Sequence, residues 1–365
     1  MTEKLKGWLG NLFPGMANLS TSLNLSGSFQ TNEPKLVVVG GGTGLSTLLR
    51  GLKSFSSNIT AIVTVGDDGG SSGRLRQELG VLPPGDIRNC LVALAGSEAL
   101  LTDLFSYRFD QGEGLAGHSF GNLFLAALTD LMQGDFLQAI QVCSEVLSVR
   151  GKVLPATLQQ VVLVAEYIDG EVIRGESRIG RTPRHIVKLS IDPDDAQALP
   201  QAISAILEAD AVILGPGSLY TSIIPNLMVK GIVEAIQKSP AVCIYVCNIM
   251  TQPGETSGHT AADHLQAILG HAKAHLVDVM LVNQGNIDMQ AMSRYQAEGG
   301  SPVIIDEEKI TESGVRLLKA DLVHSDNVVR HDSLALARMV IEVTIKERYT
   351  LQRRRALLRQ LRSMS

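Results

Sequence analysis

The chain has 365 residues, of which 45% are hydrophobic and 4% aromatic, and its formal net charge is −5. This apolar content excludes a chain that is disordered throughout, because disordered chains are poor in apolar residues. The acidic balance argues against nucleic-acid binding, which needs a basic surface. The few aromatic residues argue against a base-stacking platform. The length fits one large or two ordinary domains.

The four cysteines are typical of a protein kept in a reducing cytoplasm. No two of them form a Cys-x-x-Cys pair, so a zinc ribbon is not supported and we predict no metal ligands. No apolar run approaches the ~18 residues that a membrane helix needs. Residues 1–33 lack the long apolar core of a signal peptide. We therefore predict a cytoplasmic protein without stable membrane insertion.

Composition divides the chain into a folded part and two terminal segments. Residues 1–33 are predicted to be a mobile N-terminal extension, rich in Ser, Asn, Thr and Gly. Residues 34–345 are predicted to form a single α/β domain, with an antiparallel insertion at about 158–191. Residues 346–365 are predicted to form a basic helical tail. Such a charge run usually faces water, and the alternatives are an acidic partner or an anionic membrane surface.

The folded part opens with the pattern of a strand, a glycine loop and a helix. Apolar residues 36–39 precede GGGTG at 40–44, and the leucines that follow share one helix face. These leucines are Leu45, Leu48, Leu49 and Leu52. Further apolar runs cover residues 59–65, 211–214, 241–247 and 277–282. Fully apolar strands separated by helices indicate a buried parallel sheet.

The segment from 158 to 191 has a different sequence pattern, which is typical of antiparallel strands. Residues 161–167 and 171–174 flank an Asp-Gly turn, which is typical of a β-hairpin, and residues 184–191 can pair with it. The sequence therefore predicts an α/β fold with a mostly parallel, doubly wound sheet and a short antiparallel β extension.

Two glycine-rich loops directly after apolar strands are predicted to bind a nucleotide or phosphate. Backbone N–H groups of such loops crowd toward an anion, and the positive end of the following helix adds to the attraction. The Walker pattern is absent and the dinucleotide pattern is imperfect, so a structural turn is the alternative. The predicted residues are Gly40, Gly41, Gly42, Thr43, Gly44, Gly215, Gly217 and Ser218.

The second strand ends in the polar segment GDDGGSSGRLR, at residues 66–76. In a doubly wound sheet, ligands lie outside the carboxyl ends of the strands. Asp67 and Asp68 could hold a ribose hydroxyl, a magnesium ion or a proton in transit, and an ordinary acidic turn is the alternative. Ser71 and Ser72 join the predicted ligand-binding set. Arg74 also joins it, with a surface salt bridge as the alternative.

Polar residues at two predicted helix starts extend this set. PGDIRN, residues 84–89, opens a helix in which Asp86 is expected to be the N-cap, and capping leaves Asn89 unexplained. GHSFGN, residues 117–122, opens another helix and offers His118, Ser119 and Asn122. No acid follows to complete a triad, so nucleophilic serine chemistry is not supported.

Two further residues complete the predicted site. Asn248 follows the apolar run at 241–247 and opens the segment NIMTQPGETSG, a polar loop like those after the earlier strands. Arg330 stands before the last helical segment and could reach a phosphate; an ion pair with Asp332 is the alternative.

Several of these motifs together resemble one family. VVVGGGTGLS, TVGDDGGSSGRLR, PGDIRN, GHSFGN, LGPGSLYTSIIPNL and NIMTQPGETSG occur in the order and spacing of the YvcK-like, or gluconeogenesis factor, family. The resemblance covers about residues 35–333. It implies a Rossmann-like α/β fold in a cytoplasmic protein. It also implies a role in cell shape and in carbon metabolism during gluconeogenic growth, and UDP-sugar binding with no agreed reaction.

The same resemblance supports specific site residues: Gly40 to Gly44, Asp67, Asp68, Asn89, Asn122 and Gly215 to Ser218. The wider superfamily includes the 2-phospho-L-lactate transferase of deazaflavin-cofactor synthesis. The loop here reads GPGSLYTS, where those transferases tend to read GPSNPVTS. This difference argues against phospholactate transfer.

Two functions follow as hypotheses. The first is a UDP-sugar-binding regulator, in which the glycine loops hold the diphosphate and the acids hold sugar or ribose hydroxyls. The second is a phosphotransferase, in which Asp67 or Asp68 holds magnesium. We favour the regulator, because no residue is an unambiguous catalytic base. No catalytic residue or certain cofactor is predicted, and self-association into a homo-oligomer stays open.

Overall fold

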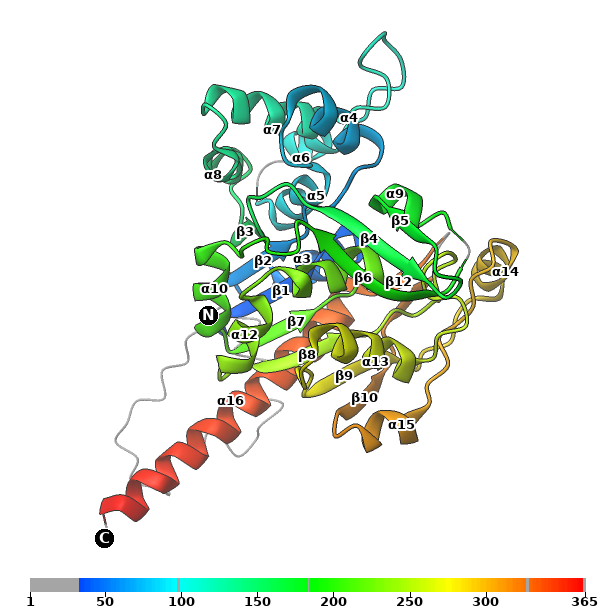
Figure 1. Ribbon diagram of the computed structural model, residues 1–365. Helices are drawn as coiled ribbons and strands as arrows, with labels where there is room; N and C mark the ends of the chain where they lie inside the picture. The colour runs from blue at the N-terminus through cyan, green and yellow to red at the C-terminus, as the bar shows by residue number, and fades with distance from the viewer. Residues whose placement is uncertain (1–32, 97–98, 183, 326–327, 364–365) are drawn as a thin grey trace.

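The computed structural model describes residues 33–96, 99–182, 184–325 and 328–363 (Figure 1). Elements carry the labels of Figure 1. Apart from Glu33, the predicted N-terminal extension lies outside the described residues, and so do the last two residues of the tail. The division of the chain into domains stays a prediction.

A seven-stranded parallel sheet forms the centre of the molecule, in the order β10-β9-β8-β7-β1-β2-β3. The predicted apolar runs form five of its strands, which confirms the mostly parallel, doubly wound sheet. The bounds are β1 Leu36–Gly40, β2 Ile59–Val63, β3 Lys152–Pro155, β7 Ala211–Leu214, β8 Val242–Val246, β9 Val279–Asn283 and β10 Arg316–Ala320.

The strand order reverses beside β1, the first strand of the fold. β1 pairs with β2 on one side and with β7 on the other, so the chain winds outward in both directions from the β1–β7 pair. The loops after β1 and β7 therefore leave the sheet next to each other. In open α/β sheets this switch point is the place where ligands bind.

Helices connect the strands and cover the sheet. Helix α3 follows the leucine pattern, and its four predicted leucines are fully buried. The helices are α3 Gly42–Leu52, α4 Gly70–Leu79, α5 Gly85–Leu94, α6 Ala99–Ser106, α7 Phe120–Leu131, α8 Phe136–Val146, α9 Glu176–Ile179, α10 Pro200–Leu207, α11 Ile224–Met228, α12 Ile232–Lys238, α13 Ala261–Ala272, α14 Met289–Ala297, α15 Glu307–Glu312 and α16 Ser333–Ser363. A π-helical turn, η1, covers Leu219–Ile223.

The predicted antiparallel extension is a separate three-stranded sheet, in the order β5-β4-β6. Its strands are β4 Val162–Tyr167, β5 Val172–Arg174 and β6 Ile186–Asp192. It does not continue the ladder of the main sheet, but its buried residues belong to the same hydrophobic core. A short antiparallel pair, β11 Val323–Ser325 and β12 Val329–His331, leads into the last helix.

Helix α16 begins against α3 and then leaves the body of the molecule (Figure 1). Its first turns bury Leu336, Ala337, Val340 and Ile341. The two helices approach so closely at Gly51 that a Cβ there would lie 1.8 Å from the backbone oxygen of Ser333. Among the described helices none is both long and apolar enough to cross a membrane.

Candidate functional site

The two glycine-rich loops touch through their backbones at the switch point. A Cβ on Gly44 would lie 2.6 Å from the carbonyl oxygen of Pro216, and one on Gly217 would lie 3.2 Å from the oxygen of Gly41. Asn248, after β8, holds the second loop: its Nδ2 donates to the Gly217 oxygen at 2.9 Å, and its Oδ1 accepts the Gly217 N–H at 3.4 Å. The loops that follow β1, β7 and β8 are thus in direct contact with one another.

A pocket of about 400 Å³ opens beside these loops. It contains six of the predicted site residues, which come from four separate segments of the chain: Thr43, Gly44, Gly217, Ser218, Asn248 and Arg330. The other loop glycines do not line it. Gly40 ends β1, Gly41 and Gly42 start α3, and Gly215 follows β7. We name this cavity the switch-point pocket.

Arg330, on β12, is exposed and adds a positively charged side chain to the lining of the switch-point pocket. Tyr295 lines the pocket beside it and donates from its hydroxyl to the Val329 oxygen at 3.2 Å, which fixes β12. Burial raises the pKa of Tyr295, and the charge of Arg330 opposes this rise. The expected alternative partner, Asp332, instead accepts the Ala335 N–H at the start of α16. No ion pair joins Arg330 to Asp332 within the described residues.

Asp86 lies beneath the first glycine loop, although its carboxylate was expected to cap a helix. That expectation is wrong: α5 starts at Gly85, Pro84 is its N-cap, and no side chain caps it. The carboxylate is so close to the loop that a Cβ on Gly41 would lie 2.5 Å from its Oδ2. Burial raises the pKa of Asp86 to about 6, while hydrogen bonds from the Gly42 backbone and the Asn89 side chain oppose the rise.

A second cavity of about 290 Å³ adjoins the switch-point pocket, and we name it the acidic pocket. Asp67, Glu176 and Glu255 line it. Ser218 and Gln252 line both cavities, and the Ser218 hydroxyl donates to Gln252 Oε1 at 2.8 Å. The two cavities therefore share one polar wall.

The carboxylates of the acidic pocket differ in their hydrogen bonding. Glu255 is 2% exposed and accepts from the Thr221 hydroxyl at 2.9 Å, from Gln252 Nε2 at 3.1 Å and from the Tyr220 N–H at 3.2 Å. Glu176 Oε2 is buried with no partner among the described residues. Burial, and next the nearby charge of Asp67, raise the pKa of Glu176 well above its ordinary value. These surroundings therefore favour the protonated form of Glu176 over the carboxylate.

Asp68 has a different environment from Asp67. Its Oδ1 accepts the Ser177 N–H at 2.8 Å, and a Cβ on Gly175 would lie 2.3 Å from its Oδ2. Asp68 thus ties the antiparallel sheet to the end of β2. Asp67 accepts the N–H of Gly69 at 2.9 Å and lines the acidic pocket.

The remaining predicted ligand residues contact one another or the backbone. Ser71 Oγ lies 2.9 Å from His118 Nδ1 and accepts from Asn122 Nδ2 at 3.1 Å. Ser119 caps α7 by accepting the Asn122 N–H. These contacts join α4 to α7, and neither cavity described above is lined by these four residues.

Three more of these residues also have partners within the protein. Ser72 accepts the Gly85 N–H at 3.1 Å, and Arg74 donates to the Ala116 oxygen at 2.7 Å. The Asn89 side chain donates a hydrogen bond to the carboxylate of Asp86. The role of these residues toward a ligand stays a prediction.

Sequence patterns missed Glu176 and Tyr295. Neither lies in a glycine-rich or acidic motif, and both reach the site through the fold. Glu255 and Gln252 lie in NIMTQPGETSG, whose loop texture marked the segment but not these side chains.

The described residues define a Rossmann-like α/β protein with its polar cavities at the switch point of a doubly wound sheet. Residues 36–323 match the family model of 2-phospho-L-lactate transferase CofD. The chain belongs to this family, and within it to the gluconeogenesis factor, or YvcK-like, proteins.

Two curated relatives and one solved structure support this membership. The gluconeogenesis factor of Bacillus subtilis is 49% identical over 312 residues, 85% of this chain and 98% of that protein. The gluconeogenesis factor of Halalkalibacterium halodurans is 50% identical over 308 residues, 84% of this chain and 95% of that protein. A UPF0052 family protein from Bacillus halodurans has a TM-score of 0.82 at 49% identity, covering 85% of this chain and 99% of that chain.

Proposed function

We propose that this protein is a cytoplasmic UDP-sugar-binding regulator of the gluconeogenesis factor type. Its role is in cell shape and in carbon metabolism during gluconeogenic growth. The observation that carries the proposal is the switch-point pocket, where two glycine loops and Arg330 face one cavity. Backbone N–H groups and a guanidinium suit a diphosphate. The names of the relatives support the metabolic role.

A second candidate is a transferase related to the family's 2-phospho-L-lactate transferase, and the family match favours it. Such a reaction would call for magnesium at Asp67 or Asp68. Within the described parts of the chain, no three or more Asp, Glu, His or Cys side chains are arranged to hold a metal ion. Asp68 is also engaged with the Ser177 backbone. The described residues thus form no cage of three protein ligands for a metal, and we derive no step through one.

One titration separates the two candidates. The regulator binds UDP-glucose with an affinity that EDTA leaves unchanged, and it leaves the ligand intact. A transferase consumes a nucleotide substrate, and its turnover stops when magnesium is chelated. Calorimetry with and without EDTA, followed by chromatography of the nucleotide, measures both properties.

The Arg330→Ala variant is expected to bind UDP-glucose about 1.5–3 kcal/mol more weakly, because it loses a charged hydrogen-bond donor to the diphosphate. Arg330→Lys should recover only part of this loss, since an ammonium lacks the bidentate fork. Calorimetry on both variants measures the change. Arg338→Ala, at an exposed position of α16, is the control and should keep the parent affinity. An unchanged Kd in Arg330→Ala would remove this residue from the site.

Asp67→Asn and Asp68→Asn are expected to separate. Asp67 lines the acidic pocket, so its loss of charge should weaken UDP-glucose binding about tenfold. Asp68 accepts a backbone N–H instead, so Asp68→Asn should cost about 1 kcal/mol of unfolding free energy and change the Kd less than about twofold. Calorimetry and urea unfolding distinguish them. Equal, negligible effects on affinity would make both residues parts of an ordinary acidic turn.

A further inference from the structure

The acidic pocket has no role in holding phosphate, because its lining would repel an anion. Asp67 and Glu255 lie on its wall, and the guanidinium of Arg330 lines the other cavity. A phosphate belongs beside Arg330, on the far side of the Ser218–Gln252 hydrogen bond. A ligand that reaches across this shared wall must enter the acidic pocket with a neutral or cationic group.

One hydrogen-bonding atom on that wall is left for a ligand, while its neighbours Ser218, Gln252 and Glu255 bond one another. Glu176 Oε2 is buried without a partner among the described residues, which is costly unless a ligand satisfies it. Ser218 and Gln252 add a hydroxyl and an amide at the junction of the two cavities. Carboxyl, hydroxyl and amide groups all exchange hydrogen bonds with hydroxyls such as those of a sugar.

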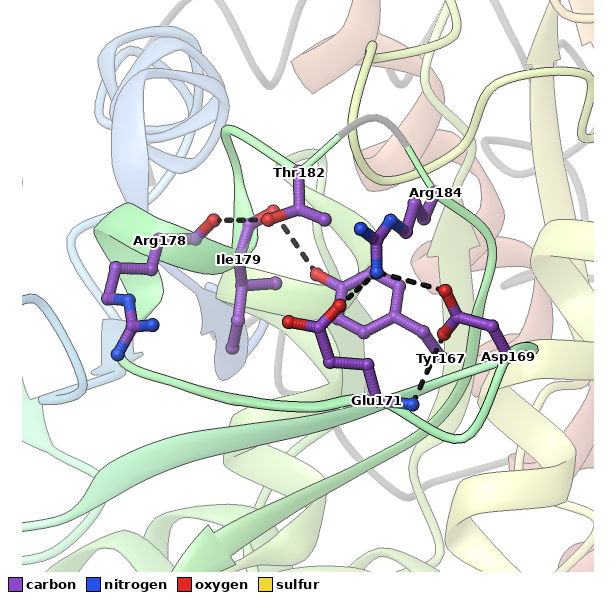
Figure 2. Close-up of polar contacts among 7 residues, drawn as sticks. All are labelled: Tyr167, Asp169, Glu171, Arg178, Ile179, Thr182 and Arg184. Atoms are coloured by element: carbon purple, nitrogen blue, oxygen red, sulfur yellow. Dashed lines mark hydrogen bonds and ion pairs between the residues drawn. The ribbon is translucent and has the colours of Figure 1, made fainter.

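The segment that carries Glu176, helix α9, lies between strands β5 and β6 of the antiparallel sheet and contacts that sheet. Figure 2 shows the contacts: Tyr167 donates from its hydroxyl to the Ile179 oxygen at 3.4 Å, and Arg184 pairs with Asp169 at 2.9 Å and with Glu171. A Cβ on Gly254 would lie 2.7 Å from the Gly180 oxygen, so the segment also meets the loop that carries Gln252 and Glu255. These contacts place Glu176 opposite the loop that supplies the rest of the pocket wall.

We propose that the acidic pocket is the subsite for the sugar of a nucleotide-sugar ligand, with the buried, unpartnered Oε2 of Glu176 hydrogen-bonded to a sugar hydroxyl. This inference rests on the proposed function and extends it. It fixes the orientation of the ligand, with the diphosphate beside Arg330 and the sugar beside Asp67 and Glu176.

The test compares UDP-glucose with UDP on two variants of Glu176. Glu176→Met keeps the volume and removes hydrogen bonding, so it should bind UDP-glucose about tenfold more weakly and UDP with the parent affinity. Glu176→Gln keeps a neutral donor and acceptor, so its UDP-glucose affinity should stay within about threefold of the parent. Glu171→Met, in the surface ion pair of the same sheet, is the matched control and should change neither Kd. Thermal unfolding checks that each variant is folded.

Two outcomes would overturn the subsite. The proposal requires Glu176→Met to bind UDP-glucose more weakly relative to UDP than the parent does, so an unchanged ratio of the two affinities refutes it. The pocket would instead be assigned to a divalent cation if two results were found together. Both Glu176 variants would bind UDP and UDP-glucose equally weakly, and EDTA would lower the parent's affinity for both ligands to the level of the variants. Failure of the parent protein to bind either ligand would overturn the proposed function and the subsite with it.

Discussion

Gly44→Ala is expected to lower the free energy of unfolding by about 2–3 kcal/mol and to remove UDP-glucose binding. Its Cβ would lie 2.6 Å from the Pro216 oxygen and 3.0 Å from the Gly217 nitrogen, both of which are backbone atoms. Overpacking of this kind typically costs about 1–3 kcal/mol. Because Gly44 and Gly217 both line the switch-point pocket, separating the loops changes the pocket itself. Urea unfolding and calorimetry measure the two effects.

Gly42→Ala is the matched control for this prediction. Gly42 has a φ of +66°, and a Cβ there would meet only the Ser222 hydroxyl, at 3.7 Å. Its cost should be the backbone strain alone, about 1 kcal/mol. A Gly42 variant that is less stable than the Gly44 variant would show that backbone conformation, and not the contact between the loops, limits this part of the fold.

Asp86→Asn is expected to stabilise the protein at neutral pH, by at most about 3 kcal/mol. Burial raises the pKa of Asp86 from an ordinary value of 3.8 to about 6, so the folded state holds the proton more tightly than the unfolded state. The favourable contribution of protonated Asp86 is therefore complete below pH 3.8 and is lost as the pH rises through 6. The Asp86→Asn variant does not lose unfolding free energy over this pH range, because an amide does not ionise.

Urea unfolding at pH 7.5 and pH 5 measures the prediction. The difference in stability between Asp86→Asn and the parent should shrink at the lower pH. Asp130→Asn, at an exposed position of α7, should change the unfolding free energy by no more than about 0.5 kcal/mol at either pH. A difference that stays constant between the two pH values would refute the buried, proton-linked role of Asp86.

The central sheet could be predicted because its strands are fully apolar and short. The run at 36–39 and the leucine spacing after it define β1 and α3 almost to the residue. Strands β3 and β10 could not be predicted from apolar runs. They lie at the two edges of the sheet, where exposed side chains such as Lys152 and Arg316 interrupt the apolar pattern.

The candidate site could be predicted where local sequence sets the backbone, as in the two glycine loops. It could not be predicted where distant segments meet. Glu176 reaches the acidic pocket on α9, where the N–H of the next residue, Ser177, donates to Asp68, 109 residues earlier in the chain. Asp86 was expected to be an N-cap because Asp often caps helices, yet its carboxylate turns toward the loop, where Gly41 leaves room for it.

The direction of α16 carries a basic stretch of sequence away from the body of the molecule. Residues 346–362 carry seven basic residues and one acid, whereas the whole chain has a net charge of −5, so the rest of the chain is considerably more acidic than that total. Lys346 and Arg348 pair with Glu342 and Asp210, and the rest of this basic sequence belongs to the part of the helix whose backbone leaves the body (Figure 1). An approaching anion is attracted to one end and repelled by the other. This orienting torque weakens as salt shortens the Debye length, to about 8 Å at physiological ionic strength.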